Sequence, residues 1–186
     1  MSRKTKITLL LGVRGCGKST YAERIARTGE RALMVVPTWD DWADKLPECK
    51  CRTRKDFTYT GIRCRVYENE NDFKAIYAHL HNAVLVLDDP RAYIGSNFDH
   101  SALKKIIIVS RKMMLDIVFV AHGFRDIPPV LFTYITDYVL FNVMDEPKLR
   151  KSWIPSNILL KLETELAKVR KRAQTDPYAR VHIRVE

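Results

Sequence analysis

The stretch that decides the fold reads Leu9-Leu10-Leu11-Gly12-Val13-Arg14-Gly15-Cys16-Gly17-Lys18-Ser19-Thr20. It contains the pattern G-x-x-x-x-G-K-[ST] of a phosphate-binding loop. Phosphate oxygens need several backbone N–H donors that converge on one point, and glycines allow the positive φ angles that this requires. The context also fits, because residues 7–11 read as a buried strand and a helix is expected over residues 18–28. We therefore expect a nucleoside triphosphate to bind here.

The residue types of the loop indicate how it would hold such a ligand. Lys18 would reach the β- and γ-phosphates as a point charge, and the Ser19 hydroxyl would ligate Mg²⁺. The helix that follows would direct its positive end at the same phosphates. The expected nucleotide-binding residues are Gly12, Val13, Arg14, Gly15, Cys16, Gly17, Lys18, Ser19 and Thr20.

A run of apolar residues that ends in two carboxylates follows later in the chain. Residues 83–87 read as a buried strand, and Asp88 and Asp89 come directly after it. The strand would deliver Asp88 to the Mg²⁺ shell, and Asp89 would orient or deprotonate the attacking water. Many strands end in acids, but the preceding phosphate loop makes this run a strong indication. A second acid beside the metal-binding one favours hydrolysis over transfer to another substrate.

Strand-like and helix-like segments alternate along the chain. Strands are expected over residues 7–11, 31–37, 62–67, 83–89, 115–121 and 138–141, and helices over 18–28, 39–46, 72–81, 101–113 and 155–173. Thr38 and Asn71 are the expected caps of the second and third helices. This order predicts the α/β class, a three-layer P-loop NTPase with a mainly parallel central sheet. Gly12, Asp88 and His122 follow strands, at the carboxyl edge where such sheets bind ligands.

The composition is that of a globular protein with a strong excess of positive charge. The chain has 186 residues, 46% of them hydrophobic, and a formal net charge of +10. The length suits one domain, and no apolar run approaches the roughly 20 residues of a membrane span. The charge favours a polyanionic partner, with a generally basic solvated surface as the alternative. Because no secretory signal pattern precedes the first strand, the four cysteines are expected to be reduced thiols.

Two further stretches leave alternatives open. Cys49, Cys51 and Cys64 offer three thiolates for zinc, with His79 or His81 as a fourth ligand, although the spacing is not the usual paired C-x-x-C. The same basic stretch would also suit a loop that contacts nucleic acid. Residues 62–67 alternate apolar and basic side chains, which predicts a strand with one wet, positive face. Residues 90–100 are expected to form a loop that contains Gly95 and Asn97.

The composition changes after residue 146. We expect residues 1–146 to form the P-loop domain and residues 147–186 to form a basic C-terminal helix and tail packed on it. The apolar face of the helix consists of Ile158, Leu162, Leu166 and Val169. Residues 180–185 alternate like an edge strand. This appendage would serve as a solvated lid, a subunit contact or a DNA-facing surface.

The segment from the double acid onward resembles the FtsK/HerA superfamily of DNA-pumping ATPases. The resemblance covers residues 6–143 and rests on the phosphate loop and on Leu87-Asp88-Asp89, Arg111 ahead of Leu115-Asp116-Ile117, Ala121-His122, and Asp137-Tyr138-Val139-Leu140-Phe141. The size of the chain is similar to that of the small genome-packaging ATPases of tailless, membrane-containing double-stranded DNA viruses.

This resemblance implies roles for two more residues. In the superfamily a polar residue, usually Gln, ends the strand after the double acid and senses the γ-phosphate, and His122 stands at that position. An arginine on the preceding helix reaches into the neighbouring subunit's site, and Arg111 matches it. The family's usual ring is a hexamer. Its sheet is RecA/FtsK-like, with the sensor strand between the phosphate-loop strand and the double-acid strand.

The resemblance also implies ligands, partners and a cellular location. The ligands would be ATP and Mg²⁺, and double-stranded DNA would pass through the ring without its sequence being read. The candidate DNA contacts are Arg52-Thr53-Arg54-Lys55, Arg91, Lys104 and Lys105. Capsid-vertex or membrane-vertex proteins would be further partners, during assembly in the host cytoplasm or at a packaging vertex of the virion.

Three other functions share parts of this pattern. A small-molecule kinase would have the same loop and length, and the basic residues 52–55 could mimic its lid. A GTPase switch lacks its guanine-reading motif here. A phage assembly ATPase of the zonula-occludens-toxin-like group would usually carry a membrane span after the ATPase domain.

Overall fold

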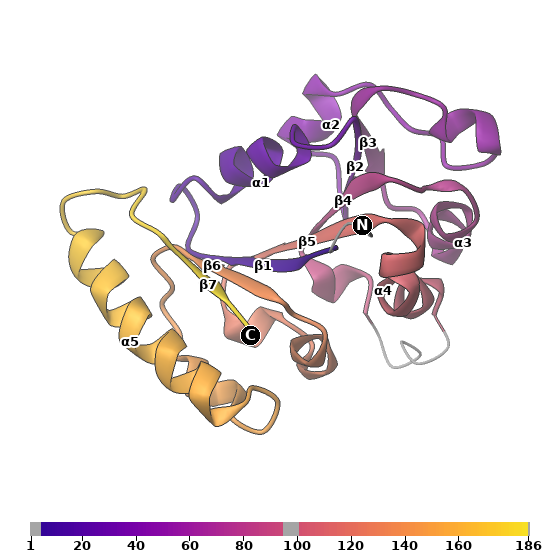
Figure 1. The fold of residues 1–186 in the computed structure, drawn as a ribbon. Coiled ribbons are helices and arrows are strands. Elements are labelled where there is room, and N and C mark those ends of the chain that lie inside the picture. The colour runs from indigo at the N-terminus through magenta and orange to yellow at the C-terminus, as the bar shows by residue number, and fades with distance from the viewer. Residues whose placement is uncertain (1–4, 95–100, 186) are drawn as a thin grey trace.

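A computed structural model describes residues 5–94 and 101–185. Its centre is a seven-stranded sheet with the order β3-β2-β4-β5-β1-β6-β7 (Figure 1). The strands are β1 (Ile7–Leu11), β2 (Arg31–Val36), β3 (Gly61–Val66), β4 (Ala83–Asp88), β5 (Leu115–Ala121), β6 (Asp137–Leu140) and β7 (Val181–Arg184). Six strands run parallel and β7 pairs antiparallel with β6. The predicted α/β class is confirmed.

Helices cover both faces of this sheet (Figure 1). The α-helices are α1 (Lys18–Ala26), α2 (Asp41–Lys45), α3 (Glu70–His79), α4 (Ala102–Met113) and α5 (Ser156–Arg172). Short 3₁₀ helices are η1 (Arg54–Phe57), η2 (Pro90–Ala92), η4 (Phe124–Asp126), η5 (Pro129–Thr133) and η6 (Pro147–Arg150). Side chains of α1 and α2 pack into one core, and those of α3, α4 and α5 pack into another on the opposite face. The three layers expected from the sequence are therefore present.

The central strands are buried on both faces, which is why they read as continuous apolar runs. In β1, Leu10 faces the core beneath α1, whereas Leu9 and Leu11 face the core on the α4 side. The strand β5 pairs with both β1 and β4, so it lies between the phosphate-loop strand and the double-acid strand. The order implied by the family resemblance is thus confirmed.

Two predicted helix caps are wrong. Asp40, not Thr38, caps α2, because its carboxylate accepts hydrogen bonds from the backbone N–H groups of Trp42 and Ala43 at 3.0 Å. Asn69, not Asn71, caps α3, and its side-chain oxygen accepts from the Asn71 N–H at 2.9 Å. Each helix lies next to more than one residue able to cap it, and only the backbone geometry selects among them.

The predicted wet, positive face of β3 is wrong at Arg65, whereas Arg63 is partly exposed. Arg65 is 4% exposed, and its guanidinium pairs with the Asp72 carboxylate at 2.8 Å and the Glu68 carboxylate at 2.9 Å. Arg65 therefore forms ion pairs that connect β3 to the start of α3. The predicted loop over residues 90–100 begins with η2, and residues 95–100, which include Gly95 and Asn97, lie outside the described residues.

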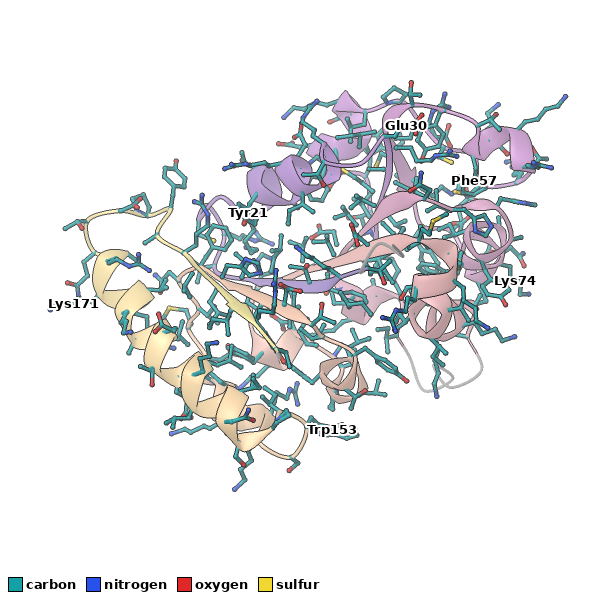
Figure 2. The ribbon with its side chains drawn as sticks, in the orientation of Figure 1. Tyr21, Glu30, Phe57, Lys74, Trp153 and Lys171 are labelled. Atoms are coloured by element: carbon teal, nitrogen blue, oxygen red, sulfur yellow. The ribbon has the colours of Figure 1, made fainter. Side chains whose placement is uncertain are left out.

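The C-terminal segment joins the sheet. The predicted edge strand is β7, whose residues Val181–Arg184 pair with Asp137–Leu140 of β6. The predicted apolar face of α5 is buried, and its exposed side carries Lys171 and other basic side chains (Figure 2). Within residues 5–94 and 101–185, none of the helices is long and apolar enough to cross a membrane.

Candidate functional site

The phosphate loop connects the carboxyl end of β1 to the start of α1. Gly15 and Gly17 have φ angles of +77° and +88°, and Gly17 is the N-cap of the helix. Positive φ angles of this kind are those that an anion-binding nest of backbone N–H groups requires. Gly12 is needed for a different reason, because a Cβ there would lie 2.6 Å from both Cys16 Sγ and Phe141 Cβ.

Lys18 lies inside this loop rather than on the surface. It is 7% exposed, and its Nζ donates a hydrogen bond to the Val13 carbonyl oxygen at 2.8 Å. Burial lowers the pKa of its ammonium group, and the nearby Asp88 carboxylate opposes that shift. The loop thus carries a cation at its centre, beside the backbone donors of the helix start.

The loop forms one wall of a cavity of about 510 Å³ at the carboxyl edge of the sheet. Its lining consists of Arg14, Gly15, Gly17, Lys18, Ser19, Thr20, Pro37, Asp88, Asp89, Val120, Ala121, His122 and Tyr178. The structure therefore brings together most of the residues singled out in the sequence. Gly12 and Val13 lie outside this lining, and Cys16 lines a neighbouring cavity instead.

Asp88 is the last residue of β4, Asp89 follows it, and both line the cavity. Asp89 has a left-handed backbone, with φ +45° and ψ +74°, so the chain turns sharply after Asp88. Burial, together with the negative charges of Asp40 and Asp89, raises the pKa of Asp88 to about 6. A carboxyl group whose ionised form is disfavoured in this way is typical of a functional site.

The donor atoms in this cavity fit a magnesium ion. Asp88 and Asp89 contribute carboxylate oxygens and Ser19 contributes a hydroxyl oxygen. Mg²⁺ prefers hard oxygen ligands and commonly combines one or two carboxylates with phosphate oxygens and water. Lys18 lies in the same cavity and would balance the remaining negative charge of a triphosphate.

His122 follows β5 and is exposed in the cavity. The chain after it is fixed by Asp145, whose carboxylate accepts from the Phe124 N–H at 3.0 Å and the Arg125 N–H at 2.8 Å. Gly123 allows this approach, since a Cβ there would lie 2.8 Å from the Asp145 oxygens. His122 lines the same cavity as Asp88 and Asp89, and an imidazole there can donate a hydrogen bond to a phosphate oxygen.

Arg111 does not lie in the cavity. It is exposed on the last turn of α4, which leads into the amino end of β5, whereas the cavity lies at the carboxyl end of that strand. A strand of seven residues is about 20 Å long. Arg111 is therefore too far away to reach the phosphate site of its own chain.

The proposed zinc ligands do not come together. The Sγ atoms of Cys49 and Cys51 are 3.5 Å apart in the core on the α3 side, while the side chain of Cys64 lies in the core on the α1 side. Strand β3 separates them because successive side chains point to opposite faces of a sheet. Within residues 5–94 and 101–185 no group of three or more His, Cys, Asp and Glu side chains could hold a metal ion. Zinc binding by these three cysteines is therefore contradicted.

Two residues near the cavity were missed at the sequence level. Asp40 lies within the second predicted helix and had no expected role at the site, yet its charge raises the pKa of Asp88. Tyr178 comes from the C-terminal tail, and its ring lies 3.1 Å from the position of a Cβ on Gly17. No local pattern indicates a role for Tyr178, because its position depends on the pairing of β7 with β6.

This chain is similar to known proteins in its fold rather than in its sequence. No protein-family model and no curated protein sequence matches the chain. Among solved structures it is similar to the genome packaging NTPase B204 of Sulfolobus turreted icosahedral virus 2 in complex with sulfate, with a TM-score of 0.67, 14% identity and 87% of each chain covered. The complex of the same protein with AMPPCP matches with a TM-score of 0.65, 13% identity, and 86% and 87% coverage.

A weaker similarity is to the N-terminal domain of zonular occludens toxin from Neisseria meningitidis, with a TM-score of 0.47, 12% identity, and coverage of 74% of this chain and 76% of that one. The likeness to B204 shows that this chain shares the fold of that NTPase. The resemblance expected from the sequence is confirmed at the level of the fold.

Proposed function

We propose that this chain is an ATP-hydrolysing motor that moves viral double-stranded DNA into a preformed capsid. The observation that carries the proposal is the meeting of Lys18, Ser19, Asp88, Asp89 and His122 in one cavity at the carboxyl edge of the sheet. The likeness of the fold to a protein described as a genome packaging NTPase, and crystallised with AMPPCP, supports both the nucleotide and the process.

The phosphate loop would hold the triphosphate. Backbone N–H groups of the loop and the positive end of α1 would surround the β-phosphate, and Lys18 would leave the Val13 carbonyl to reach the β- and γ-phosphates. Ser19 and Asp88 would hold Mg²⁺, with Asp40 keeping the negative charge around Asp88 high. When bound, Mg²⁺ would neutralise charge that develops on the phosphate oxygens.

Asp89 and His122 would act on the γ-phosphate. The Asp89 carboxylate would accept a hydrogen bond from the attacking water, orient it in line with the leaving oxygen and take up its proton. His122 would donate a hydrogen bond to a γ-phosphate oxygen and so detect whether the phosphate is present. The residues after His122 are hydrogen-bonded to Asp145, which lies just before the C-terminal part of the chain. These hydrogen bonds would carry the signal to that part.

Arg111 would complete the site of a neighbouring subunit. It is exposed on α4 and too distant from its own cavity, so its guanidinium could serve only a site on another chain. The working form would then be a homo-oligomeric ring, with a hexamer favoured. Residues 1–146 would provide the ATPase core of each subunit, and residues 147–186 would pack on it through α5 and β7.

Double-stranded DNA would bind through its phosphates. The net charge of +10 suits contacts that do not depend on base sequence. Among the candidate contacts, residues 52–55 lie in an exposed basic turn that contains η1, and Arg91 is held by an ion pair with Asp126. Capsid-vertex or membrane-vertex proteins would anchor the motor during assembly, in the host cytoplasm or on the virion.

ATP hydrolysis measured with and without long double-stranded DNA, over a salt series, tests this function. We expect turnover that DNA stimulates, and stimulation that fades as salt rises, because counterion release drives backbone binding. Lys18→Ala provides the blank. Hydrolysis that DNA leaves unchanged at every salt concentration would contradict the motor, and phosphate transfer to a small-molecule acceptor would favour a kinase.

A further inference from the structure

A second cavity adjoins the phosphate cavity along α1. It has a volume of about 380 Å³ and is lined by Cys16, Gly17, Thr20, Tyr21, Arg24, Phe141, Tyr178 and Arg180. Gly17, Thr20 and Tyr178 also line the phosphate cavity, so the two cavities meet at the start of the helix. Small-molecule sites commonly have volumes in this range.

The walls of the second cavity are aromatic and cationic. The Arg180 guanidinium carbon lies 4.9 Å from the centroid of the Tyr21 ring, and Tyr21 meets Phe141 edge to face at 5.9 Å between centroids. Tyr21 projects from the side of α1 that faces the C-terminal tail (Figure 2). None of the lining residues is a carboxylate. Rings and a guanidinium plane are surfaces on which a nucleobase stacks.

Tyr178 is held in place although its side chain is 58% exposed. Its backbone N–H donates to the Asp176 carboxylate at 2.9 Å, and its carbonyl oxygen accepts from Arg180 Nη1 at 3.3 Å. The pairing of β7 with β6 fixes the chain immediately after it. The ring thus stands over Gly17 with one part of it open to the cavities.

The positions of the acids set the direction of a bound nucleotide. Asp88, Asp89 and His122 line the phosphate cavity and do not line the second one. A triphosphate whose γ end lies at these residues would direct its α-phosphate toward Thr20, and the nucleoside would continue into the second cavity. Resting on the function proposed above, we propose that the second cavity is the nucleobase subsite and that Tyr178 stacks on the base.

This assignment gives the C-terminal appendage a role in its own chain. The tail that carries Tyr178 closes the nucleotide site from the side of α1, so base binding would depend on residues beyond the P-loop domain. Because stacking uses the π face that every base has, Tyr178 would add affinity without selecting strongly among bases.

Calorimetric binding of ATP and of inorganic tripolyphosphate, each with Mg²⁺, tests the proposal. We expect Tyr178→Ala to weaken ATP binding about 5- to 100-fold and to leave tripolyphosphate binding unchanged. Tyr178→Phe keeps the ring and is expected to bind ATP like the wild type. Tyr77→Ala removes a tyrosine of α3 that lines neither cavity, and it serves as the matched control.

Two results would overturn the proposal. One is unchanged ATP affinity in Tyr178→Ala, and the other is an equal loss for ATP and tripolyphosphate, which would place the effect on the phosphate loop. Wild-type protein that binds neither compound would instead refute the proposed function itself. Thermal melting of each variant shows that it is folded.

Discussion

The backbone N–H of Asp89 donates to the Val120 carbonyl oxygen at 3.0 Å, which joins the turn after β4 to the end of β5. In the same way, the Gly12 N–H donates to the Ala121 carbonyl oxygen at 3.3 Å. The phosphate loop and the double acid are thus both fixed to the strand that leads to His122. Since backbone groups make these contacts, side-chain substitutions at the acids should leave the arrangement intact.

Asp89→Asn should retain nucleotide binding and lose most hydrolysis. The amide keeps the size of the side chain, and the backbone contact with Val120 does not depend on it, but an amide cannot take up a proton from water. We expect the turnover rate to fall about 100- to 10,000-fold, measured by phosphate release. Asp41→Asn, at an exposed carboxylate of α2, is the matched control. Full turnover in Asp89→Asn would exclude Asp89 as the water-orienting acid.

Arg111→Ala should lower hydrolysis by about 10³-fold or more, as loss of an arginine finger does in NTPases that use one. Mixing this variant with Asp89→Asn should recover part of the activity, because some interfaces then pair an intact cavity with an intact arginine. Lys112→Ala, on the same helical turn, should not behave in this way. With mixed rings demonstrated by mass spectrometry, a mixture without any activity would count against action between subunits.

Asp88→Asn should make the protein more stable while removing Mg²⁺-dependent binding. In the wild type, burial and the charges of Asp40 and Asp89 disfavour the Asp88 carboxylate. Its removal is expected to raise the free energy of unfolding by about 1–2 kcal/mol at pH 7, measured by urea titration in the presence of EDTA. A destabilised variant would show that nearby positive charge, such as that of Lys18, outweighs the burial of the Asp88 carboxylate.

Asp72→Ala should destabilise the fold. The carboxylate is buried, pairs with Arg65 at 2.8 Å and accepts from the Glu68 N–H at 2.8 Å. Loss of one partner of a buried ion pair leaves the other charge uncompensated and costs about 3–5 kcal/mol. Glu68→Ala removes an exposed partner of the same arginine and should cost less than about 1 kcal/mol. Equal losses in the two variants, measured by urea unfolding, would refute the assigned role of Asp72.

The strands were the most predictable part of the fold. Both β1 and β5 begin and end at the predicted residues, because strands buried on both faces consist largely of apolar residues. The phosphate loop could be recognised because its chemistry requires glycines at fixed spacing. Residue order along the chain does not specify which strands are neighbours, and the position of β5 came only from the family resemblance.

Other features depend on contacts between residues far apart in the sequence and could not be predicted from the local sequence. The alternating pattern predicts a surface position for Arg65, whereas the structure buries it beside Asp72. Tyr178 lies against Gly17 only because β7 pairs with β6. Asp40 and Asp88 approach because β2 and β4 are neighbours in the sheet. The roles of Asp89, His122 and Arg111 in catalysis stay predictions.

Displacement of a third strand bound to linear duplex DNA is the most direct test of the motor. The wild-type protein with ATP and Mg²⁺ should move along the duplex and release the third strand, and release should slow as salt rises. Asp89→Asn with ATP, and wild type with a non-hydrolysable analogue, should leave it bound. Wild-type protein that binds the duplex and hydrolyses ATP but leaves the third strand in place would contradict translocation.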